Sequence, residues 1–516
     1  MNTQTPQFET VRELVDALRQ IAPHAQLCID SRKVQVGDIF FAFRVAGGAG
    51  DGRNFIESAI KSGAKIVVYE PENFVWTESK SVVGLEVPDL ANKIGVIANA
   101  WFKRPDQEML CVAITGTNGK TSCSQWIAHA LSNNDRPTAA IGTLGIALAR
   151  NGQFENIVET GLTTPDALQL QTQLANLKNL GARAIAIEAS SIGLVQGRLK
   201  GLHVDIALFT NLTRDHLDFH GNIENYSAAK ASLFARAELK AAVINLDDEF
   251  GETLAKSLQE RANLEIITYS LNGKTLQGTT SLLADHIQHS ANGCRFRVTS
   301  RFGERRVDTR LTGAFNVSNA LGVLGVLIAS KLSWEAALKA IEVLESAPGR
   351  MQRVGYSAQT MVIVDYAHTP DALEKTIAAL KPIAQERRGE LWCVFGCGGD
   401  RDPGKRPQMG RIAESAEHVI VTSDNPRTEN PSQIIDDIVH GMLRPPHVIE
   451  DRAKAILYAI KHAKVNDVVL IAGKGHEAYQ EINGKRWSFS DQAHAELALA
   501  SVARGSMSSP SNLRGE

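Results

Sequence analysis

The chain lacks the features that would place it in a membrane or on nucleic acid. No apolar run in its 516 residues approaches the ~20 residues that cross a bilayer. Residues 1–10 have neither the basic region nor the apolar stretch of a signal peptide. The 55 Lys and Arg and 57 Asp and Glu nearly cancel, and they form no basic block that would bind a phosphate backbone. We therefore expect a soluble, cytoplasmic, monomeric protein that does not bind nucleic acid.

Cysteine is scarce for a chain of this length. Only Cys393 and Cys397 lie close together, and their spacing matches no common zinc or redox motif. We expect free thiols in a reducing compartment. The six cysteines are Cys28, Cys111, Cys123, Cys294, Cys393 and Cys397.

The pattern of apolar and polar residues divides the chain into sections, because a chain this long exceeds one core and favours about three domains. We expect a mixed domain over 1–107, a central α/β domain over 108–347, a second α/β domain over 348–504 and a disordered tail over 505–516. The expected strands are 38–43 and 65–69 in the first section, 111–114, 184–188, 206–210 and 241–245 in the second, and 361–366, 391–396, 418–422 and 467–472 in the third.

Three further segments stand out from this alternation. A glycine-rich loop spans 46–52 in the first section. A more polar, β-like stretch over 280–310 is expected to interrupt the central alternation, and an apolar helix over 316–329 follows it. A turn at 347–349 marks the next boundary.

The most informative stretch is residues 114–122, which read ITGTNGKTS. A buried strand precedes it and a helix follows, so Gly116 and Gly119 let backbone N–H groups approach a phosphate. Lys120 supplies a charge for the outer phosphates of a nucleotide triphosphate, and Thr121 a hydroxyl for Mg²⁺. Ile114 stands where the general phosphate-loop pattern has glycine, so the loop is a shorter variant. An incidental glycine turn is the less favoured alternative, because strand, turn, Lys-Thr and helix occur in the right order.

Two later loops carry candidate metal ligands. Glu188 ends a strand at the sheet edge where α/β proteins bind ligands, and it is either a Mg²⁺ ligand near Thr121 or a cap of the next helix. Residues 210–218 follow another strand, and His216 is either a ligand there or part of a surface loop. Lys230 by itself reads as a solvated helix position. Asp215 and Asp218 are plausible caps or supporting partners of the same loop.

Residues 115–122, 188–196, 211–218 and 365–371 resemble the Mur ligases of peptidoglycan synthesis over nearly the whole chain. The resemblance implies three α/β domains: a mixed N-terminal UDP-sugar domain, a central parallel-sheet ATPase domain with a P-loop, and a C-terminal Rossmann-like domain. It also implies an ATP-dependent acid–amino-acid ligase of cell wall biogenesis, which forms ADP and phosphate through an acyl-phosphate intermediate. Cell shape and cell division would depend on that activity.

The resemblance assigns ATP and two Mg²⁺ ions to particular residues. Thr121 and Glu188 would hold one ion, and His216 with Lys230 the second, the lysine being carbamylated. Lys120, Glu188, His216 and Lys230 are therefore the expected catalytic residues. Helix capping and an interdomain ion pair are the alternatives for Asn316, Asn319, Arg350 and Asp365. The expected ATP-binding residues are Gly116, Thr117, Asn118, Gly119, Lys120, Thr121, Ser122, Asn316, Arg350 and Asp365.

The resemblance further implies a UDP-N-acetylmuramoyl-L-alanyl-D-glutamate substrate. Leu162 departs from the asparagine that precedes the two threonines in some relatives. The loop at 46–52 is about two residues longer than the family's, so Gly48–Gly50 are not assigned. The expected contacts to this substrate are Ile29, Ser31, Thr163, Thr164, Ser190, Gln196 and Arg198.

The amino-acid acceptor that the resemblance implies is meso-2,6-diaminopimelate, which carries one carboxylate more than lysine. Pro426 fixes the loop that presents Arg427, whose guanidinium can clamp that carboxylate with two charge-assisted hydrogen bonds. Glu477 would receive an ammonium group of the same acceptor. The alternative is an arginine used only in a surface salt bridge. The full expected set is Arg401, Asp424, Asn425, Pro426, Arg427, Gly473 and Glu477.

Two other functions remain open at this point. A folylpolyglutamate synthetase has a similar ATPase core, but the N-terminal section and Arg427 argue against it. A nucleotide-binding regulatory or scaffold protein is the second, and the intact set of Lys120, Glu188, His216 and Lys230 argues against that.

Overall fold

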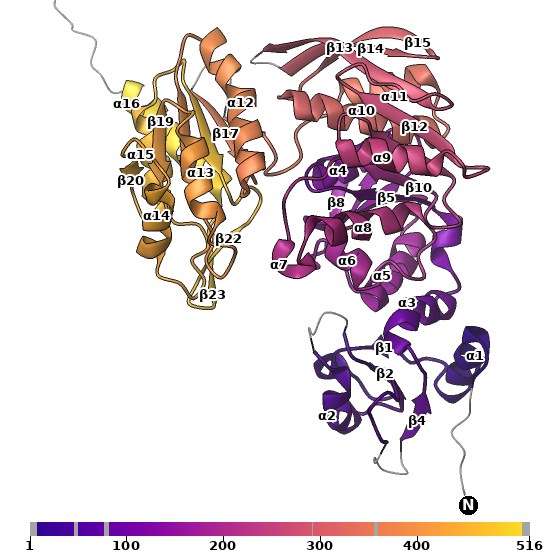
Figure 1. Cartoon of the computed structure of the whole chain (residues 1–516). Helices are drawn as coiled ribbons and strands as arrows, with labels where there is room; N and C mark the ends of the chain where they lie inside the picture. The colour runs from indigo at the N-terminus through magenta and orange to yellow at the C-terminus, as the bar shows by residue number, and fades with distance from the viewer. Residues whose placement is uncertain (1–7, 46–49, 77–81, 291–292, 356–359, 508–516) are drawn as a thin grey trace, which may run out of the picture.

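The computed structural model describes residues 8–45, 50–76, 82–290, 293–355 and 360–507. Three α/β domains follow one another along the chain, each built on its own main sheet (Figure 1). Among the described residues, no helix is long and apolar enough to cross a membrane. All six cysteines are free, as expected.

The N-terminal domain is a four-stranded parallel sheet in the order β1-β2-β3-β4. The two central strands of the sheet are buried on both faces, and two apolar clusters cover the two sides. The strands are β1 (Leu27–Cys28), β2 (Ile39–Ala42), β3 (Ile66–Tyr69) and β4 (Val83–Glu86), and the helices are α1 (Val11–Ile21), α2 (Ile56–Lys61) and α3 (Leu90–Trp101), with 3-10 turns η1 (Ser31–Lys33), η2 (Gly52–Phe55) and η3 (Pro105–Glu108). The loop residues 46–49 lie outside the described residues.

The central domain contains an eleven-stranded sheet in the order β15-β14-β13-β12-β11-β10-β5-β9-β6-β7-β8. Strands β13 to β6 of that order pair in parallel, and antiparallel pairs form both edges. The strands are β5 (Leu110–Thr115), β6 (Thr138–Gly142), β7 (Gly145–Arg150), β8 (Gln153–Val158), β9 (Ala184–Glu188), β10 (Ile206–Phe209), β11 (Ala241–Asn245), β12 (Glu265–Ser270), β13 (Thr280–Ser290), β14 (Gly293–Ser300) and β15 (Gly303–Thr309).

The expectation that residues 280–310 interrupt the alternation of strands and helices is confirmed, because β13, β14 and β15 follow β12 with no helix between them in the described part of the chain. β13 pairs in parallel with β12, beginning at Ile267 opposite Thr280, so this stretch extends the same sheet. Its first half alternates buried and half-buried residues, which allows one face to pack against the core while the rest of the strand stays polar. The apolar helix expected next is α10 (Ala314–Ala329), and it is buried along almost its whole length.

The helices of the central domain cover both faces of its sheet (Figure 1). Because β10, β5 and β9 are adjacent and parallel, the loops that follow them meet at one edge. The helices are α4 (Lys120–Ser132), α5 (Ala167–Asn179), α6 (Ser191–Val195), α7 (Leu217–His220), α8 (Ile223–Phe234), α9 (Glu249–Leu258), α10 and α11 (Trp334–Glu342).

The C-terminal domain is a six-stranded sheet in the order β16-β17-β21-β18-β19-β20, parallel except for β16. A separate hairpin, β22 and β23, stands beside it. The strands are β16 (Gln352–Val354), β17 (Met361–Asp365), β18 (Leu391–Phe395), β19 (His418–Val421), β20 (His447–Val448), β21 (Val468–Ala472), β22 (Tyr479–Ile482) and β23 (Lys485–Ser488), and the helices are α12 (Pro370–Glu386), α13 (Lys405–Ala413), α14 (Pro431–His440), α15 (Arg452–His462) and α16 (Asp491–Met507).

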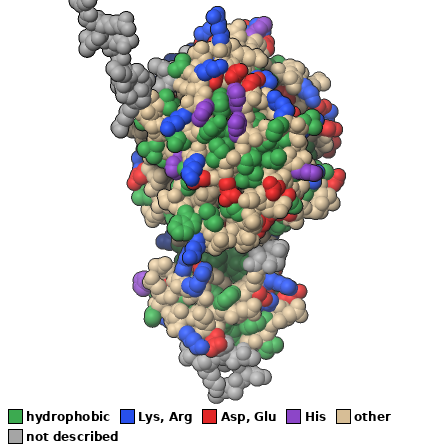
Figure 2. Space-filling model, turned by 90° about the vertical axis from the view of Figure 1, so that its left-hand side faces the viewer, with side chains coloured by type: hydrophobic (Ala, Val, Ile, Leu, Met, Phe, Trp, Pro, Cys, Tyr) green, Lys and Arg blue, Asp and Glu red, His purple; other side chains and the backbone are tan. Residues whose placement is uncertain are grey.

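Helix α16 extends to Met507, three residues into the segment for which we expected disorder. Ala495, Ala498 and Leu499 anchor this helix in the core beside α15, so the helix continues beyond the point where the composition changes. Residues 508–516 lie outside the described residues. Figure 2 views the molecule from the side of this domain and shows basic and acidic side chains interspersed on that face.

A buried ion pair joins α15 and α16 at their first residues. Arg452 donates from Nε and Nη2 to the two carboxylate oxygens of Asp491, both at 2.7 Å, and neither side chain is exposed. Nη2 also donates to the carbonyl of Ala472 at the end of β21. The pair therefore ties both helices to the sheet edge.

Replacing Asp491 with alanine should destabilise the protein by about 3–5 kcal/mol, because the guanidinium of Arg452 would stay buried without its partner. Urea unfolding followed by circular dichroism measures the loss. Glu496→Ala, on an exposed position of the same helix, is the matched control and should change stability little. Equal losses in the two variants would contradict a specific role of the pair.

Candidate active site

The phosphate loop lies between the end of β5 at Thr115 and the start of α4 at Lys120. Gly116 has φ +148°, and a Cβ there would lie 1.9 Å from Oγ1 of Thr210. Gly119 has φ +91°, and a Cβ there would lie 2.6 Å from Oδ1 of Asn319. Both glycines are required by close packing and by their backbone conformation. Ser122 is buried in the first turn of α4.

Lys120 folds back over this loop. Its Nζ donates to the carbonyls of Gly116 and Thr117, both at 2.9 Å. Burial lowers the pKa of Lys120, and the nearby carboxylates of Glu188 and Asp215 act in the opposite direction. The amino group therefore lies at the loop where a phosphate would bind.

Glu188 ends β9 and is almost fully buried beside the phosphate loop. Its Oε2 accepts from Oγ1 of Thr121 at 3.1 Å, and its two oxygens accept from the backbone N and Oγ1 of Thr143 at 2.9 and 3.2 Å. The alternative interpretation as a helix cap is wrong, since Ser190 caps α6 by accepting from the N–H of Gly193.

The donor set at this position fits a magnesium ion. A threonine hydroxyl and a carboxylate are hard oxygen donors, and Mg²⁺ in nucleotide sites is typically held by one or two carboxylates together with substrate phosphates. No cluster of three or more His, Cys, Asp or Glu side chains suited to a metal occurs among the described residues. Thr121 and Glu188 would by themselves supply two oxygen ligands to such an ion.

The loop after β10 is hydrogen-bonded to the phosphate loop. Asn211 accepts from the N–H of Asn118 at 2.9 Å and donates to its carbonyl at 3.1 Å. Oγ1 of Thr117 accepts from the N–H of Thr213 at 2.9 Å. Three motifs of the sequence are thus in direct contact at one sheet edge: the phosphate loop, Glu188 and the loop over 210–218.

His216 caps α7 with φ +52° and lines a large cavity. Its Nε2 lies 3.5 Å from Oδ2 of Asp215. Burial lowers the pKa of His216, and Asp215 opposes that shift. Burial thus favours the neutral imidazole, whose lone pair could bind a ligand. Asp218 lies in the same short helix and is not its cap.

Lys230 is almost fully buried on α8, so its interpretation as a solvated helix position is wrong. Its Nζ lies 4.2 Å from the centre of the Tyr226 ring. The Tyr226 hydroxyl lies 3.0 Å from Oγ1 of Thr117 and so links this helix to the phosphate loop. Burial, and then the charge of Lys120, hold the pKa of Lys230 well below its ordinary value.

Arg350, in the C-terminal domain, contacts Thr121, the threonine that also bonds to Glu188. Its Nη2 donates to Oγ1 of Thr121 at 3.2 Å, and its guanidinium lies 4.2 Å from the centre of the Tyr366 ring. Asp365 instead accepts from the N–H groups of Met351 and Ala367, and burial raises its pKa. Among the described residues neither Arg350 nor Asp365 forms an ion pair, which contradicts the alternative of an interdomain ion pair.

The two asparagines of α10 lie on the other side of the loop. Asn316 donates to the carbonyl of Thr312 at 2.9 Å, and Asn319 donates to Oδ1 of Asn316 at 3.4 Å. Asn319 also packs against Gly119. Asn319 is therefore in contact with the phosphate loop, and Asn316 lies next to Asn319.

The residues expected to bind the muramoyl dipeptide form one cluster beside Glu188. Oγ1 of Thr164 donates to the carbonyl of Glu188 at 2.7 Å and lies 2.9 Å from Oγ of Ser190. Arg198 donates to the carbonyl of Thr164 and to Oε1 of Gln196. Oγ1 of Thr163 lies 3.2 Å from Oγ1 of Thr143.

A cavity of 2280 Å³ lies between this cluster and the C-terminal domain. Ile29 and Ser31 are in the N-terminal domain and do not line it, and Leu162 lines it without an amide group. Of the expected site residues, the lining includes Thr163, Ser190, Arg198 and His216 from the central domain, and Arg401, Asp424, Asn425, Arg427, Gly473 and Glu477 from the C-terminal domain.

Arg427 sits at a strained turn with φ +53°, directly after Pro426. Its backbone bonds to Glu481 and Asn483 of the hairpin, and its Nη1 donates to the carbonyl of Gly399 at 2.6 Å. Nε lies 3.8 Å from Oε2 of Glu481. The guanidinium is mostly buried and lines the cavity, so an exposed surface salt bridge does not describe it.

The sequence reasoning missed several residues of the site. Thr143 and Tyr226 hold Glu188 and Lys230 and carry no motif of their own. Lys474 is buried beside Glu477. In the sequence, the glycines on both sides of Lys474 were the feature that could have indicated a special position. His368 and His476 also line the cavity, and burial lowers the pKa of each to about 4.

The fold and the site together define a nucleotide-dependent enzyme with several domains. A phosphate loop, an adjacent buried carboxylate and an arginine from the next domain meet at one threonine hydroxyl, and a cavity opens beside them.

Comparisons with known proteins identify the family. Residues 114–327 match the Mur ligase middle domain, residues 349–475 the Mur ligase glutamate ligase domain, and residues 25–102 the Mur ligase family catalytic domain. A UDP-N-acetylmuramoyl-L-alanyl-D-glutamate--2,6-diaminopimelate ligase of Janthinobacterium sp. (strain Marseille) is 52% identical over 491 residues, covering 94% of this chain and 96% of its own. The chain belongs to the Mur ligase family.

Two further relatives carry the same name. The ligase of Ralstonia nicotianae is 49% identical over 503 residues, covering 95% of this chain and 96% of its own. A solved structure of such a ligase is 38% identical, covers 94% of this chain and 98% of that one, and superposes with a TM-score of 0.66. The three-domain α/β architecture expected from the sequence is thus confirmed.

Proposed function

We propose that the chain joins meso-2,6-diaminopimelate to the D-glutamyl carboxylate of UDP-N-acetylmuramoyl-L-alanyl-D-glutamate at the expense of ATP. The names of relatives that span almost the whole chain support this reaction. The reaction belongs to peptidoglycan precursor synthesis, and we place it in the cytoplasm and in a monomer.

The cavity is the observation that carries the proposal. It is lined on one side by the residues expected to bind the muramoyl dipeptide and on the other by those expected to bind the acceptor. Lys120 and the Thr121–Glu188 pair lie at the same edge of the central sheet. The cavity therefore brings together groups for the dipeptide and for the acceptor, and the phosphate loop lies beside it at the edge of the central sheet.

The first chemical step is phosphoryl transfer to the D-glutamyl carboxylate. A carboxylate oxygen attacks the γ-phosphorus of ATP, the bond to the β,γ-bridging oxygen breaks, and ADP leaves. Lys120 neutralises charge on the transferring group, and the N–H groups of the loop hold the remaining phosphates. Bound Mg²⁺ adds positive charge at these phosphates, and Thr121, Glu188, His216 and the carbamate of Lys230 are the residues that would hold two ions.

The second step is attack by the amine of the acceptor on the acyl phosphate, which forms the amide and releases phosphate. Water competes for the same intermediate, so the cavity must close before transfer. Arg350 already joins the C-terminal domain to Thr121, and Asn118 donates to Asp371 of α12 at 3.0 Å. These two contacts show how the C-terminal domain approaches the phosphate loop.

A release assay distinguishes this reaction from the alternatives. Phosphate release with ATP should require both the muramoyl dipeptide and meso-diaminopimelate, and should not occur with a folate and glutamate. Turnover with folate would favour a folylpolyglutamate synthetase. Binding of ATP without turnover under any acceptor would favour a regulatory protein.

We expect Lys230 to be carbamylated, because a buried lysine with a disfavoured ammonium is a suitable precursor. Protein equilibrated with ¹³C-bicarbonate should show a carbamate carbon signal that Lys230→Arg lacks. Ligase activity of that variant should fall about 10–100-fold or more, as when support of a metal is lost. Lys256→Arg on an exposed position is the control. A normal rate in Lys230→Arg would remove the carbamate from the mechanism.

A further inference from the structure

We propose that Lys474 is a positioning residue that fixes the carboxylate of Glu477 for the second amino group of the acceptor. This inference rests on the proposed function, since Glu477 receives that ammonium group only if diaminopimelate binds in the cavity. Lys474 itself does not line the cavity, so it acts through Glu477.

The loop between β21 and β22 directs Lys474 into the domain. Gly473 has φ +118°, and a Cβ there would lie 2.5 Å from Oδ2 of Asp424. Gly475 has φ +53°, and a Cβ there would lie 2.6 Å from the carbonyl oxygen of Gly349. Because no other residue fits either position, the backbone turns tightly on both sides of Lys474 and its side chain is fully buried.

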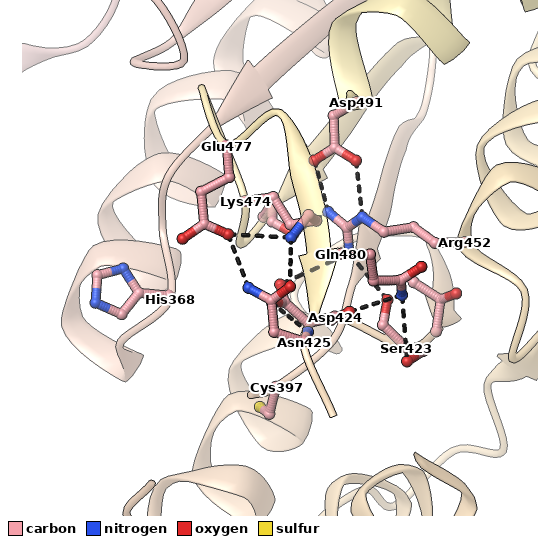
Figure 3. Close-up of polar contacts among 12 residues, drawn as sticks. His368, Cys397, Ser423, Asp424, Asn425, Arg452, Lys474, Glu477, Gln480 and Asp491 are labelled. Carbon is pink, nitrogen blue, oxygen red and sulfur yellow. Dashed lines mark hydrogen bonds and ion pairs between the residues drawn. The ribbon is translucent and has the colours of Figure 1, made fainter. Parts of the chain in front are cut away.

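The buried ammonium of Lys474 has two oxygen partners (Figure 3). Nζ donates to Oε2 of Glu477 at 3.0 Å and to Oδ1 of Asn425 at 2.9 Å. It lies 5.5 Å from the centre of the Tyr479 ring. A buried charge requires hydrogen-bond partners. The two oxygens therefore fix the position of the ammonium group, and the ammonium group in turn holds the side chains of Glu477 and Asn425 in place.

Asn425 is the second group that holds the same carboxylate oxygen. Its Nδ2 donates to Oε2 of Glu477 at 2.8 Å. Its Oδ1 accepts from Lys474 and also from the N–H of Glu481 at 2.9 Å, so the orientation of the amide is fixed from two directions. Without Lys474 the amide keeps its bond to Glu481, whereas Glu477 loses its only charged partner within this network.

Two donors on Oε2 leave Oε1 of Glu477 for the substrate. Figure 3 shows that oxygen pointing away from Lys474 and Asn425, on the side where His368 lies. Glu477 and His368 both line the cavity. A carboxylate held in this way presents one oxygen in a fixed direction to an ammonium group.

The test compares two acceptors that differ only at the group in question. 2-Aminopimelate lacks the second amino group and cannot use Glu477. Lys474→Met should raise the KM for meso-diaminopimelate about tenfold or more, the size expected for weakening a hydrogen bond to a charged group. The affinity for 2-aminopimelate, measured as KM or as Ki against meso-diaminopimelate, should change less than about twofold, and kcat and the KM for ATP should be retained. Lys454→Met, on an exposed position, is the control.

Equal losses for both acceptors would overturn the proposal, because general damage to the domain does not distinguish them. An unchanged KM for meso-diaminopimelate would overturn it too. If wild type does not ligate meso-diaminopimelate, the proposed function fails and this inference with it. If wild type does and Lys474→Met does not discriminate, this inference alone fails.

A second variant covers the case in which Lys474→Met does not fold, since it would leave Glu477 without its charged partner. Lys474→Met/Glu477→Gln removes both charges. Its KM for meso-diaminopimelate should match that of Glu477→Gln alone within about twofold, because residues that act through one contact are not additive. A further tenfold rise in the double variant would show that Lys474 acts independently of Glu477.

Discussion

Replacing Lys120 with alanine is expected to abolish the ADP formation that depends on both substrates. The ammonium group lies over the phosphate loop, held by the carbonyls of Gly116 and Thr117. It is the one cation of that loop, and it opposes the negative charge that spreads over the transferring phosphoryl group. Removal of one such group from a preorganised site costs about 10²–10³ in kcat. Coupled measurement of ADP with ATP, the muramoyl dipeptide and diaminopimelate tests this.

The fold should not change in the Lys120 variant, because the side chain bonds only to carbonyls of its own loop in the described structure. Melting temperature therefore serves as the control for folding. Lys339→Ala, on an exposed position of α11, controls for loss of a lysine elsewhere in the same domain. Full activity of Lys120→Ala would exclude the proposed mechanism.

The parallel sheets were predictable from the sequence because their strands are short apolar runs. All ten expected strands form, and their ends agree with the structure within one residue. Strand β6 was missed because its Ala and Gly residues give a weak signal without their neighbours, whereas β12 carries Ile and Tyr and could have been recognised. The domain bounds remain predictions.

The meeting of motifs at one sheet edge was also predictable, because parallel strands present their carboxyl ends together. The environment of each side chain was not. The sequence around Lys230 predicts a solvent-exposed helix position. The structure shows that the side chain is buried and packs against Tyr226. Glu188 reads equally well as a cap, and only its bonds to Thr121 and Thr143 decide. The role of each site residue stays a prediction until it is measured.

The choice of acceptor was predicted from Arg427, and the structure adds what holds it. The turn at Pro426 and the bonds to the hairpin fix the backbone, while Gly399 holds one guanidinium nitrogen. A planar guanidinium fixed in this way matches a second carboxylate and has no partner in lysine. We therefore expect specificity to depend on a rigid arginine on the C-terminal domain.

Wild-type enzyme should accordingly prefer meso-diaminopimelate to L-lysine by a large factor in kcat/KM. Truncating one partner of a buried charge pair costs about 2–5 kcal/mol, which corresponds to a factor of about 30 to a few thousand. Arg427→Met should lose most of this factor by lowering kcat/KM for meso-diaminopimelate, while the rate with lysine changes little. Arg411→Met, whose side chain is 55% exposed on α13, should keep the wild-type ratio. Equal kcat/KM for the two acceptors in wild type would overturn the role of Arg427, because a clamp for the second carboxylate must discriminate against an acceptor that lacks it.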